Sequence, residues 1–399
     1  MTGGLIFAII KPAMKQILLA VLALILVLIF GFATAGFDVF TKNHSIASIG
    51  ITSASSKKMN LNLLGSQKDL SLLPEGIKWD PDGHISYVTF PNGNRRFFIE
   101  GNQSAYVIDT PTPVTLAQAL SKNPSIKKVF GPDPGISYRN NYATIASVVQ
   151  TDPQNLYHLF AFTQYEQQAE GADGTYDYST FTASIGLLES KDGGNTWKDY
   201  GPVIRGDDYI DPGTKISGAG EPCAIIVNGY VYVYFVDWAA GNKISHPDAI
   251  YLARTKIFPD GGLGAFEYYT TSGFNTSPSN LVPVISMPNF ANADYASLPS
   301  ISYNKYLDQY FAVFETNVGF VQATSIDGIN WTNEKLFYSF AQPQSDRQTG
   351  DTWVSYPTLL SDQSETSDGS TQGSGTLYFA KGIWPNTAHQ LTAISFQFK

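Results

Sequence analysis

The chain has 399 residues, of which 43% are hydrophobic, 14% aromatic and only 15% charged, so it can bury a large core and is not a disordered chain. Its formal net charge of -9 argues against a nucleic-acid partner, because phosphate binding needs concentrated lysine and arginine and the chain has no such run. The 35 Gly, 22 Pro, 23 Tyr and 25 Phe favour short strands joined by turns, and the single cysteine, Cys223, excludes an internal disulfide.

The N-terminus carries an apolar segment, QILLAVLALILVLIFGFATAGF, that is long enough to cross a bilayer as a helix. Two lysines precede it, and a small-residue Ala-Thr-Ala sequence at 33–35 is typical of a cleavage site. We expect residues 1–37 to be a signal peptide or an uncleaved membrane anchor, with the body exported in either case. Residues 38–79 are polar with little periodicity, which indicates a stalk or lead-in.

From residue 80 onward the chain repeats a hairpin pattern. The clearest copy is EPCAIIVNGYVYVYFVDW at 221–238, two alternating runs around an Asn-Gly turn, and comparable hairpins begin near residues 85, 142, 298 and 356. A third strand follows several of these hairpins, and a fourth follows some. Antiparallel strands recurring five times in this way are typical of blades around an axis. We therefore predict an all-β fold, a five-bladed β-propeller over residues 80–399, preceded by the hydrophobic helix.

Two similar segments, SKDGGNTW at 190–197 and SIDGINW at 325–331, fall at one place in the repeat, between the third and fourth strands. Glycine supplies the special backbone angle of such a turn, Asp and Ser bond the turn amides, and Trp packs between sheets. We therefore expect Asp192 and Asp327 to be structural rather than catalytic.

These motifs resemble those of known propellers. The first turn matches the Asp-box of sialidase-like proteins, and the second resembles the blade turn of five-bladed glycosidase-like propellers. Gly220-Glu221-Pro222 ahead of NGYVYVYF is similar to the Glu-bearing blade of glycoside hydrolase family 43, where that Glu is the general acid of an inverting hydrolysis; the resemblance implies the same role for Glu221. The chain lacks the sialidase Phe-Arg-Ile-Pro motif, and Asp133-Pro134 lies in a turn-like GPDPG rather than in the early Ala-Asp-Pro motif that carries the base of family 43.

Topology gives a second argument for the site. In a propeller the innermost strand leaves the mouth of the axis and the next strand returns to it, so first-strand entries and second-strand ends face the mouth. The entries are His84, Asn141, Glu221, Leu298 and Tyr356, and the ends are Glu100, Glu166, Asp237 and Glu315. Carboxylates therefore converge on the mouth.

Such a convergence suits the hydrolysis of a glycosidic bond, which needs a protonated acid and an ionised carboxylate. We expect Glu221 to be the acid, with Glu166 and Asp237 as the base or as groups that tune its pKa. The expected substrate-binding side chains are Trp238, Tyr165, Trp353 and Tyr356, which would stack on sugar rings, and His84 and Arg139, which would bond hydroxyls. The structural alternative is that a Glu at a strand entry bonds backbone amides and that blade aromatics pack in the core.

The expected function is that of an exported carbohydrate-active protein, a monomeric glycoside hydrolase acting on polysaccharide or glycan termini, either secreted or anchored at the cell surface. The alternatives are a non-catalytic sugar-binding or adhesion propeller and a scaffold for protein contacts. The membrane is a partner only through the N-terminal segment. We expect no cofactor, because the five His lack ligand spacing and no phosphate loop is present; a calcium or sodium ion in the central channel is compatible with the sequence but not indicated by it.

Overall fold

The computed structural model describes residues 60–70, 81–111, 114–122, 124–168, 181–206, 216–238, 249–287, 293–361, 369–386 and 388–399. All of them belong to the second of two units into which the chain divides, Lys57–Lys399. The predicted signal or anchor segment lies in the first unit, Met1–Ser56, outside the described residues. Among the described residues no helix is long and apolar enough to cross a membrane.

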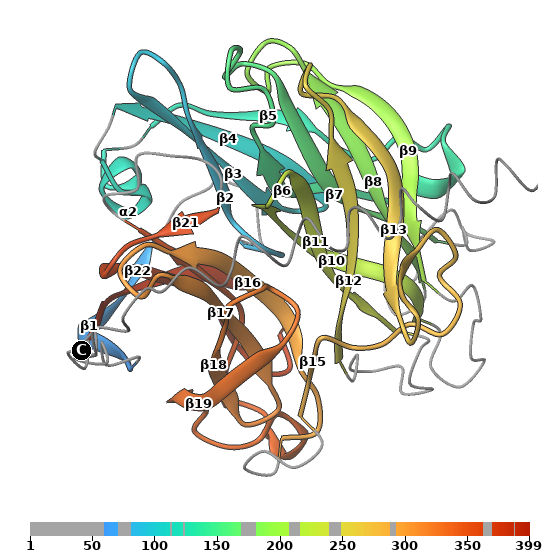
Figure 1. Cartoon of the computed structure of the whole chain (residues 1–399). Helices are drawn as coiled ribbons and strands as arrows, with labels where there is room; N and C mark the ends of the chain where they lie inside the picture. The colour runs from blue at the N-terminus through green and yellow to red at the C-terminus, as the bar shows by residue number, and fades with distance from the viewer. Residues whose placement is uncertain are drawn as a thin grey trace, which may run out of the picture. The chain divides into compact units, whose positions relative to one another are not determined.

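The described part is almost entirely β-structure, in five successive groups of antiparallel strands (Figure 1). The groups are β2–β5 (Ser86–Thr89, Asn94–Gly101, Ser104–Pro111, Ile126–Phe130), β6–β9 (Tyr142–Val149, Leu159–Gln167, Phe181–Ser190, Lys198–Arg205), β10–β13 (Ile216–Val227, Tyr230–Asp237, Ala249–Ile257, Leu263–Thr270), β16–β19 (Ser297–Asn304, Gln309–Thr316, Gly319–Ser325, Trp331–Ser339) and β20, β22 and β23 (Thr352–Leu360, Ser374–Ile383, His389–Phe398). The remaining elements are short: β14 (Gly273–Asn275), β15 (Ile285–Ser286), β21 (Ser370–Thr371), α2 (Leu116–Leu120) and the 3-10 turns η1 (Ser137–Arg139) and η2 (Gln344–Asp346). A short parallel pairing of β10 with β8 joins the second and third groups into one sheet.

The hairpins predicted from the sequence are confirmed. They are β2–β3, β6–β7, β10–β11, β16–β17 and β20–β22. The turn between β10 and β11 has positive φ at both Asn228 (49°) and Gly229 (79°), which is the geometry that favours Asn-Gly in a two-residue hairpin.

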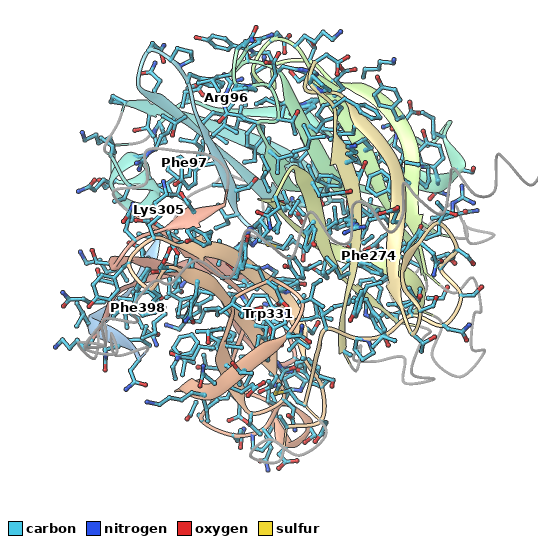
Figure 2. All side chains as sticks on the ribbon, viewed as in Figure 1. Arg96, Phe97, Phe274, Lys305, Trp331 and Phe398 are labelled. Carbon is cyan, nitrogen blue, oxygen red and sulfur yellow. The ribbon has the colours of Figure 1, made fainter. Side chains whose placement is uncertain are left out.

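The fifth group is completed by β1 (Leu61–Leu70), which comes from the other end of the described chain and lies beside the C-terminus (Figure 1). It pairs antiparallel with β23, from Leu61 opposite Phe398 to Leu70 opposite Leu391. Phe398 in turn packs edge-on against Phe311 at 4.8 Å, so this pairing reaches the core (Figure 2). The sheet structure therefore begins by Leu61, which corrects the expected lead-in over 38–79. An edge strand with most side chains exposed is polar, as a stalk is, so composition does not separate the two.

The two Asp-Gly turns join third to fourth strands, as predicted, and their carboxylates are engaged in the turns. Asp192 Oδ1 accepts the backbone amides of Asn195 and Thr196 at 3.0 Å each. Asp327 Oδ1 accepts those of Ile329 and Asn330 at 2.9 and 2.8 Å. The Trp that follows the second turn, Trp331, packs edge-on against Tyr234 of β11 at 6.1 Å (Figure 2), so the structural role expected for both turns holds.

The first strands of the groups together line a cavity of about 40 Å³, called the central channel below, and they are linked by a repeated hydrogen bond. In each case a small side chain of one first strand accepts a backbone N–H of the next: Ser147 from Ala224 (2.9 Å), Cys223 from Ile301 (3.2 Å), Ser300 from Leu359 (3.0 Å) and Thr358 from Ile85 (3.1 Å). The last of these links the fifth group back to the first. The single buried cysteine is therefore a structural acceptor in this ring.

Candidate active site

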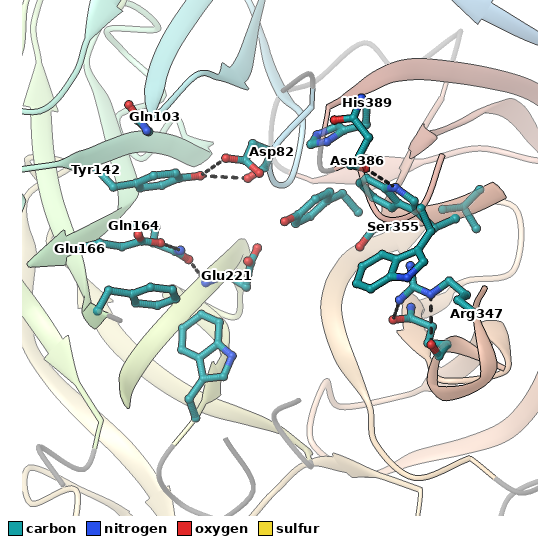
Figure 3. Close-up of a pocket in the computed structure, with 17 residues that line it drawn as sticks. Asp82, Gln103, Tyr142, Gln164, Glu166, Glu221, Arg347, Ser355, Asn386 and His389 are labelled. Carbon is teal, nitrogen blue, oxygen red and sulfur yellow. Dashed lines mark hydrogen bonds between the residues drawn. The ribbon is translucent and has the colours of Figure 1, made fainter. Parts of the chain in front are cut away.

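A cavity of about 420 Å³ lies where several first strands begin (Figure 3). Its carboxylates are Asp82, Glu166 and Glu221, its larger aromatic rings are Tyr142, Phe181, Trp238, Trp353, Tyr356 and Trp384, and its basic side chains are Arg347 and His389. Carboxylates beside aromatic rings in a partly enclosed cavity are typical of sites that bind and cleave sugars.

Glu221 enters the cavity from a β-bulge in the middle of β10. The register between β10 and β11 shifts between Gly220 and Cys223, and Glu221 has a positive φ of 55°. The same irregularity recurs in β16 at Leu298 (φ 52°) and in β20 at Tyr356 (φ 56°). A non-glycine residue held at positive φ is strained, so these bulges are specific features of the fold that re-aim one side chain per strand.

Gln164 ties the two glutamates of the site together. Its Oε1 accepts the backbone N–H of Glu221 at 2.7 Å, and its Nε2 donates to Glu166 Oε1 at 2.8 Å. Gly220 leaves room for this contact, because a Cβ there would lie 2.5 Å from Gln164 Oε1 and 2.3 Å from Cζ3 of Trp238. Packing against Trp238 and Gln164 therefore explains why the residue before Glu221 is glycine.

Asp82 is a site residue that the sequence analysis missed. The Tyr142 hydroxyl lies 3.2 Å from Asp82 Oδ2 and 3.2 Å from Glu100 Oε2, beneath the cavity. His389 donates from Nε2 to the carbonyl of Pro81 at 2.8 Å, next to this carboxylate. An Asp-Pro-Asp sequence at 80–82, just before the first hairpin, marks this residue, and the predicted strand entry, His84, lies two residues after it.

The electrostatic surroundings separate Asp82 from Glu221. Burial, reinforced by the charges of Glu100, Asp82, Glu166 and Glu315, raises the pKa of Glu221 well above its usual value. Burial also raises the pKa of Asp82, but the nearby His389 and hydrogen bonds from Tyr142 and Tyr356 act in the opposite direction. Glu221 is therefore the better proton donor and Asp82 the better acceptor.

Glu166 stands between these two cases. Burial raises its pKa to about 8, whereas the hydrogen bond from Gln164 favours the ionised form. A group that changes its charge so near neutral pH is placed to alter the proton affinity of the other carboxyls.

The structure brings five of the nine predicted site residues to the cavity. They are Glu221, Glu166, Trp238, Trp353 and Tyr356. Gln164 and Tyr142 also line it, from the same strand as Glu166 and from the strand paired with it. Gln164 was readable from the sequence, because it lies two residues before Glu166 and therefore on the same face of β7.

The other four predicted residues do not line this cavity. Tyr165 and Asp237 were misplaced for one reason: each adjoins a true lining residue in its strand, so its side chain points to the opposite face. The Tyr165 hydroxyl donates to Asp199 at 2.7 Å, and a Cβ on Gly206 would lie 2.5 Å from the Asp237 carboxylate. Both side chains therefore lie outside the lining of this cavity.

Arg139 and His84 also have other surroundings. The Arg139 Nε lies 3.0 Å from Asp199 Oδ2, and its guanidinium stacks over Phe130 at 5.1 Å. His84 lines the central channel, with Nδ1 3.3 Å from Thr358 Oγ1, and burial lowers its pKa to about 4, so it is neutral. No group of three or more His, Cys, Asp or Glu in the described part is arranged to hold a metal, and an ion in the channel stays a prediction.

The fold is similar to that of solved glycoside hydrolases with propeller folds, at low sequence identity. The catalytic domain of a family 62 α-L-arabinofuranosidase from Coprinopsis cinerea is 12% identical with a TM-score of 0.50, covering 85% of this chain and 97% of that one. A family 117 glycoside hydrolase from Zobellia galactanivorans is 10% identical with a TM-score of 0.48, covering 86% of this chain and 92% of that one. An α-L-arabinanase from Penicillium chrysogenum, complexed with arabinobiose, is 10% identical with a TM-score of 0.46, covering 84% of this chain and 99% of that one.

No protein-family model matches the chain, and neither does any curated protein sequence. At this low identity the structural likeness shows the all-β fold alone. It does not support the sialidase-like part of the predicted resemblance.

Proposed function

We propose that the protein is a glycoside hydrolase that uses Glu221 as general acid and Asp82 as general base across this cavity, and that its five antiparallel groups are the blades of a five-bladed propeller. One observation carries the proposal: three carboxylates converge on one cavity, and their surroundings raise the pKa of Glu221 well above its usual value, whereas His389, Tyr142 and Tyr356 oppose the rise that burial causes in the pKa of Asp82. The observed fold likeness to glycoside hydrolases agrees with it but carries no residue roles.

In the proposed reaction Glu221 donates its proton to the glycosidic oxygen as the bond from that oxygen to the anomeric carbon breaks. A water molecule forms the new bond to the anomeric carbon, and its proton passes to Asp82. Glu166, held by Gln164, tunes the proton affinity of both groups. Direct attack by water inverts the anomeric configuration, as in the family whose motif Glu221 resembles. Exchange of protons with solvent restores the starting state.

The aromatic side chains of the cavity suit a sugar ligand. Trp353 and Tyr356 line it from β20 and Trp238 lines it from the end of β11, so a ring can be contacted from more than one side. We further propose that the protein acts outside the cell as a monomer, secreted or held at the cell surface by residues 1–37.

The decisive variant is Glu221→Gln, which keeps the shape of the side chain but cannot deliver a proton. The parent and the variant are assayed on a panel of aryl glycosides and oligosaccharides that includes α-L-arabinofuranosides. On unactivated substrates turnover should fall by about 100-fold or more. The loss should be smaller on aryl glycosides whose leaving groups depart without protonation.

Asp237→Asn is the matched control, because Asp237 is a buried carboxylate of the same sheet that does not line the cavity. A folded Asp237→Asn protein should keep its turnover. An active parent whose Glu221→Gln variant cleaves an unactivated glycoside at an unchanged rate would remove Glu221 from the mechanism. A parent that binds sugars but cleaves none of the panel would favour the binding propeller instead.

A further inference from the structure

Arg347 lines the cavity opposite the carboxylates, and the structure describes no salt bridge for it. In Figure 3 it lies across the cavity from Glu166. A half-buried guanidinium without a carboxylate in contact is unusual, because a desolvated cation is normally paired. We propose that the substrate is an anionic glycan whose carboxylate or sulfate group binds Arg347. The inference rests on the proposed function and adds the chemical class of the substrate.

The guanidinium is held in one orientation before any ligand binds. Its Nε donates to the Gln344 carbonyl at 3.1 Å, and its Nη2 donates to Gln344 Oε1 at 2.7 Å. The ring of Trp384 lies over it, with 5.1 Å from Cζ to the ring centroid. One edge and one face are thus occupied, and no residue in the described part accepts a hydrogen bond from Nη1, so the edge formed by Nη1 and Nη2 is left for a ligand. A planar fork fixed in this way matches a carboxylate or sulfate.

The buried acid Glu315 attracts this arginine electrostatically but is linked to it by hydrogen bonds only through an amide. Gln344 donates from Nε2 to Glu315, and the Ser355 hydroxyl donates to Glu315 Oε2 at 2.6 Å. Burial raises the pKa of Glu315 to about 7, so its negative charge is incomplete near neutral pH. Glu315 therefore fixes Gln344, and through it Arg347, without neutralising the guanidinium by direct contact.

The position of Arg347 also assigns the charged group to a part of the substrate. A second cavity of about 90 Å³ shares Arg347, Gln344, Trp353 and Val354 with the main one, so Arg347 lies where the two meet. An anion placed there is kept away from the ionised carboxylate of the proposed base, Asp82, which would repel it. The charge therefore belongs on a sugar next to the residue that is cleaved, and not on the cleaved residue.

The test measures binding, using the full chain with Glu221→Gln so that no ligand is hydrolysed. Calorimetry compares a galacturonate-containing oligosaccharide and a sulfated galactan oligosaccharide, each with its neutral counterpart made by carboxyl reduction or desulfation. We expect at least one anionic ligand to bind about tenfold or more tightly than its counterpart, as a charge-assisted bidentate contact provides. The preferred arm identifies the anion, and raised salt should weaken the preference.

Adding Arg347→Gln should abolish the preference while changing affinity for the neutral ligands by less than about threefold, and Arg347→Lys should keep part of it. Arg254→Gln is the control: Arg254 also stacks on an aromatic ring, Phe274 at 3.7 Å, but lines neither cavity. The inference is overturned if the anionic and neutral ligands bind with equal affinity or if neither anion binds. It is also overturned if folded Arg347→Gln protein loses the same affinity for both kinds of ligand. If the parent hydrolyses neutral glycans and shows no preference for anions, the anionic substrate class is overturned while the proposed activity stands. If the protein binds the anions but hydrolyses nothing, only the proposed activity is overturned.

Discussion

Gly220→Ala is expected to damage the fold and the site together. A Cβ at Gly220 would lie 2.3 Å from Cζ3 of Trp238 and 2.5 Å from Oε1 of Gln164, so the indole ring and the amide must both move. Overpacking of this kind costs about 1–3 kcal/mol, and a weakened hydrogen bond from Glu221 N–H to Gln164 adds about 1 kcal/mol. We expect the free energy of unfolding to fall by about 2–4 kcal/mol.

The same displacement should lower activity, because Gln164 positions both Glu221 and Glu166. A misplacement of about 1 Å in a catalytic group typically costs about 100-fold in rate, so we expect kcat/KM to fall by about 10- to 100-fold. Urea denaturation followed by circular dichroism gives the stability, and steady-state kinetics at a temperature where both proteins are folded gives kcat/KM.

Gly264→Ala in β13 is the control for the alanine itself. The nearest atom to its Cβ would be Cζ of Phe258 at 3.3 Å, at the end of a side chain that can move. Its free energy of unfolding should change by no more than about 0.5 kcal/mol. A Gly220→Ala protein as stable and as active as the parent would refute the packing argument. A destabilised but fully active one would show that Gln164 does not position the carboxyls.

Three further predictions follow from the same contacts. Tyr142→Phe removes a hydrogen bond that favours ionised Asp82, so the pKa of Asp82 should rise and the acidic limb of kcat/KM should move to higher pH; an unmoved limb would argue against Asp82 as base. Turn hydrogen bonds outweigh burial and lower the pKa of Asp192 to about 2, so its ionised form stabilises the parent above pH 3.8 and this stability is lost as the pH falls toward about 2. Asp192→Asn should keep activity at neutral pH but lack this pH-dependent stability, which urea titrations at several pH values measure. Removing residues 1–56 should leave a folded monomer in size-exclusion chromatography. Removing residues 1–70 also deletes β1 and exposes the edge of β23, so that protein should aggregate. Identical behaviour of the two proteins would contradict the role of β1.

The hairpins were predictable because their signal is local. Alternation and an Asn-Gly turn in residues 221–238 predict the hairpin of β10 and β11. The two Asp-Gly turns contain the side chains that bond their own backbone amides. Strand β1 was not predictable in this way. Its partner, β23, lies more than 300 residues later, and an exposed edge strand shows no clear apolar alternation. Pairings that close a sheet from opposite ends of the chain leave no local pattern to read.

The site was predicted in part because a motif marks Glu221, while the face of each neighbouring residue depends on register. Tyr165 adjoins Glu166 and Asp237 adjoins Trp238, and in both pairs one side chain lines the cavity and the other does not. Asp82 was overlooked through a shift of two residues at a strand entry. Arg347 comes from an irregular segment after η2, where neither period nor motif indicates a role.

The bulges interrupt the alternation of side chains within three of the first strands. Each inserts an additional residue at positive φ, so a strict alternation counted back from the channel position assigns the wrong face. At this repeated position the chain uses Glu221, Leu298 and Tyr356, which are an acid, an aliphatic residue and a phenol on one backbone geometry. The backbone therefore supplies a place for a side chain without fixing its chemistry. Which of these positions carries the proposed proton donor is decided by its surroundings, and for Glu221 these are the other carboxylates of the cavity and the amide of Gln164.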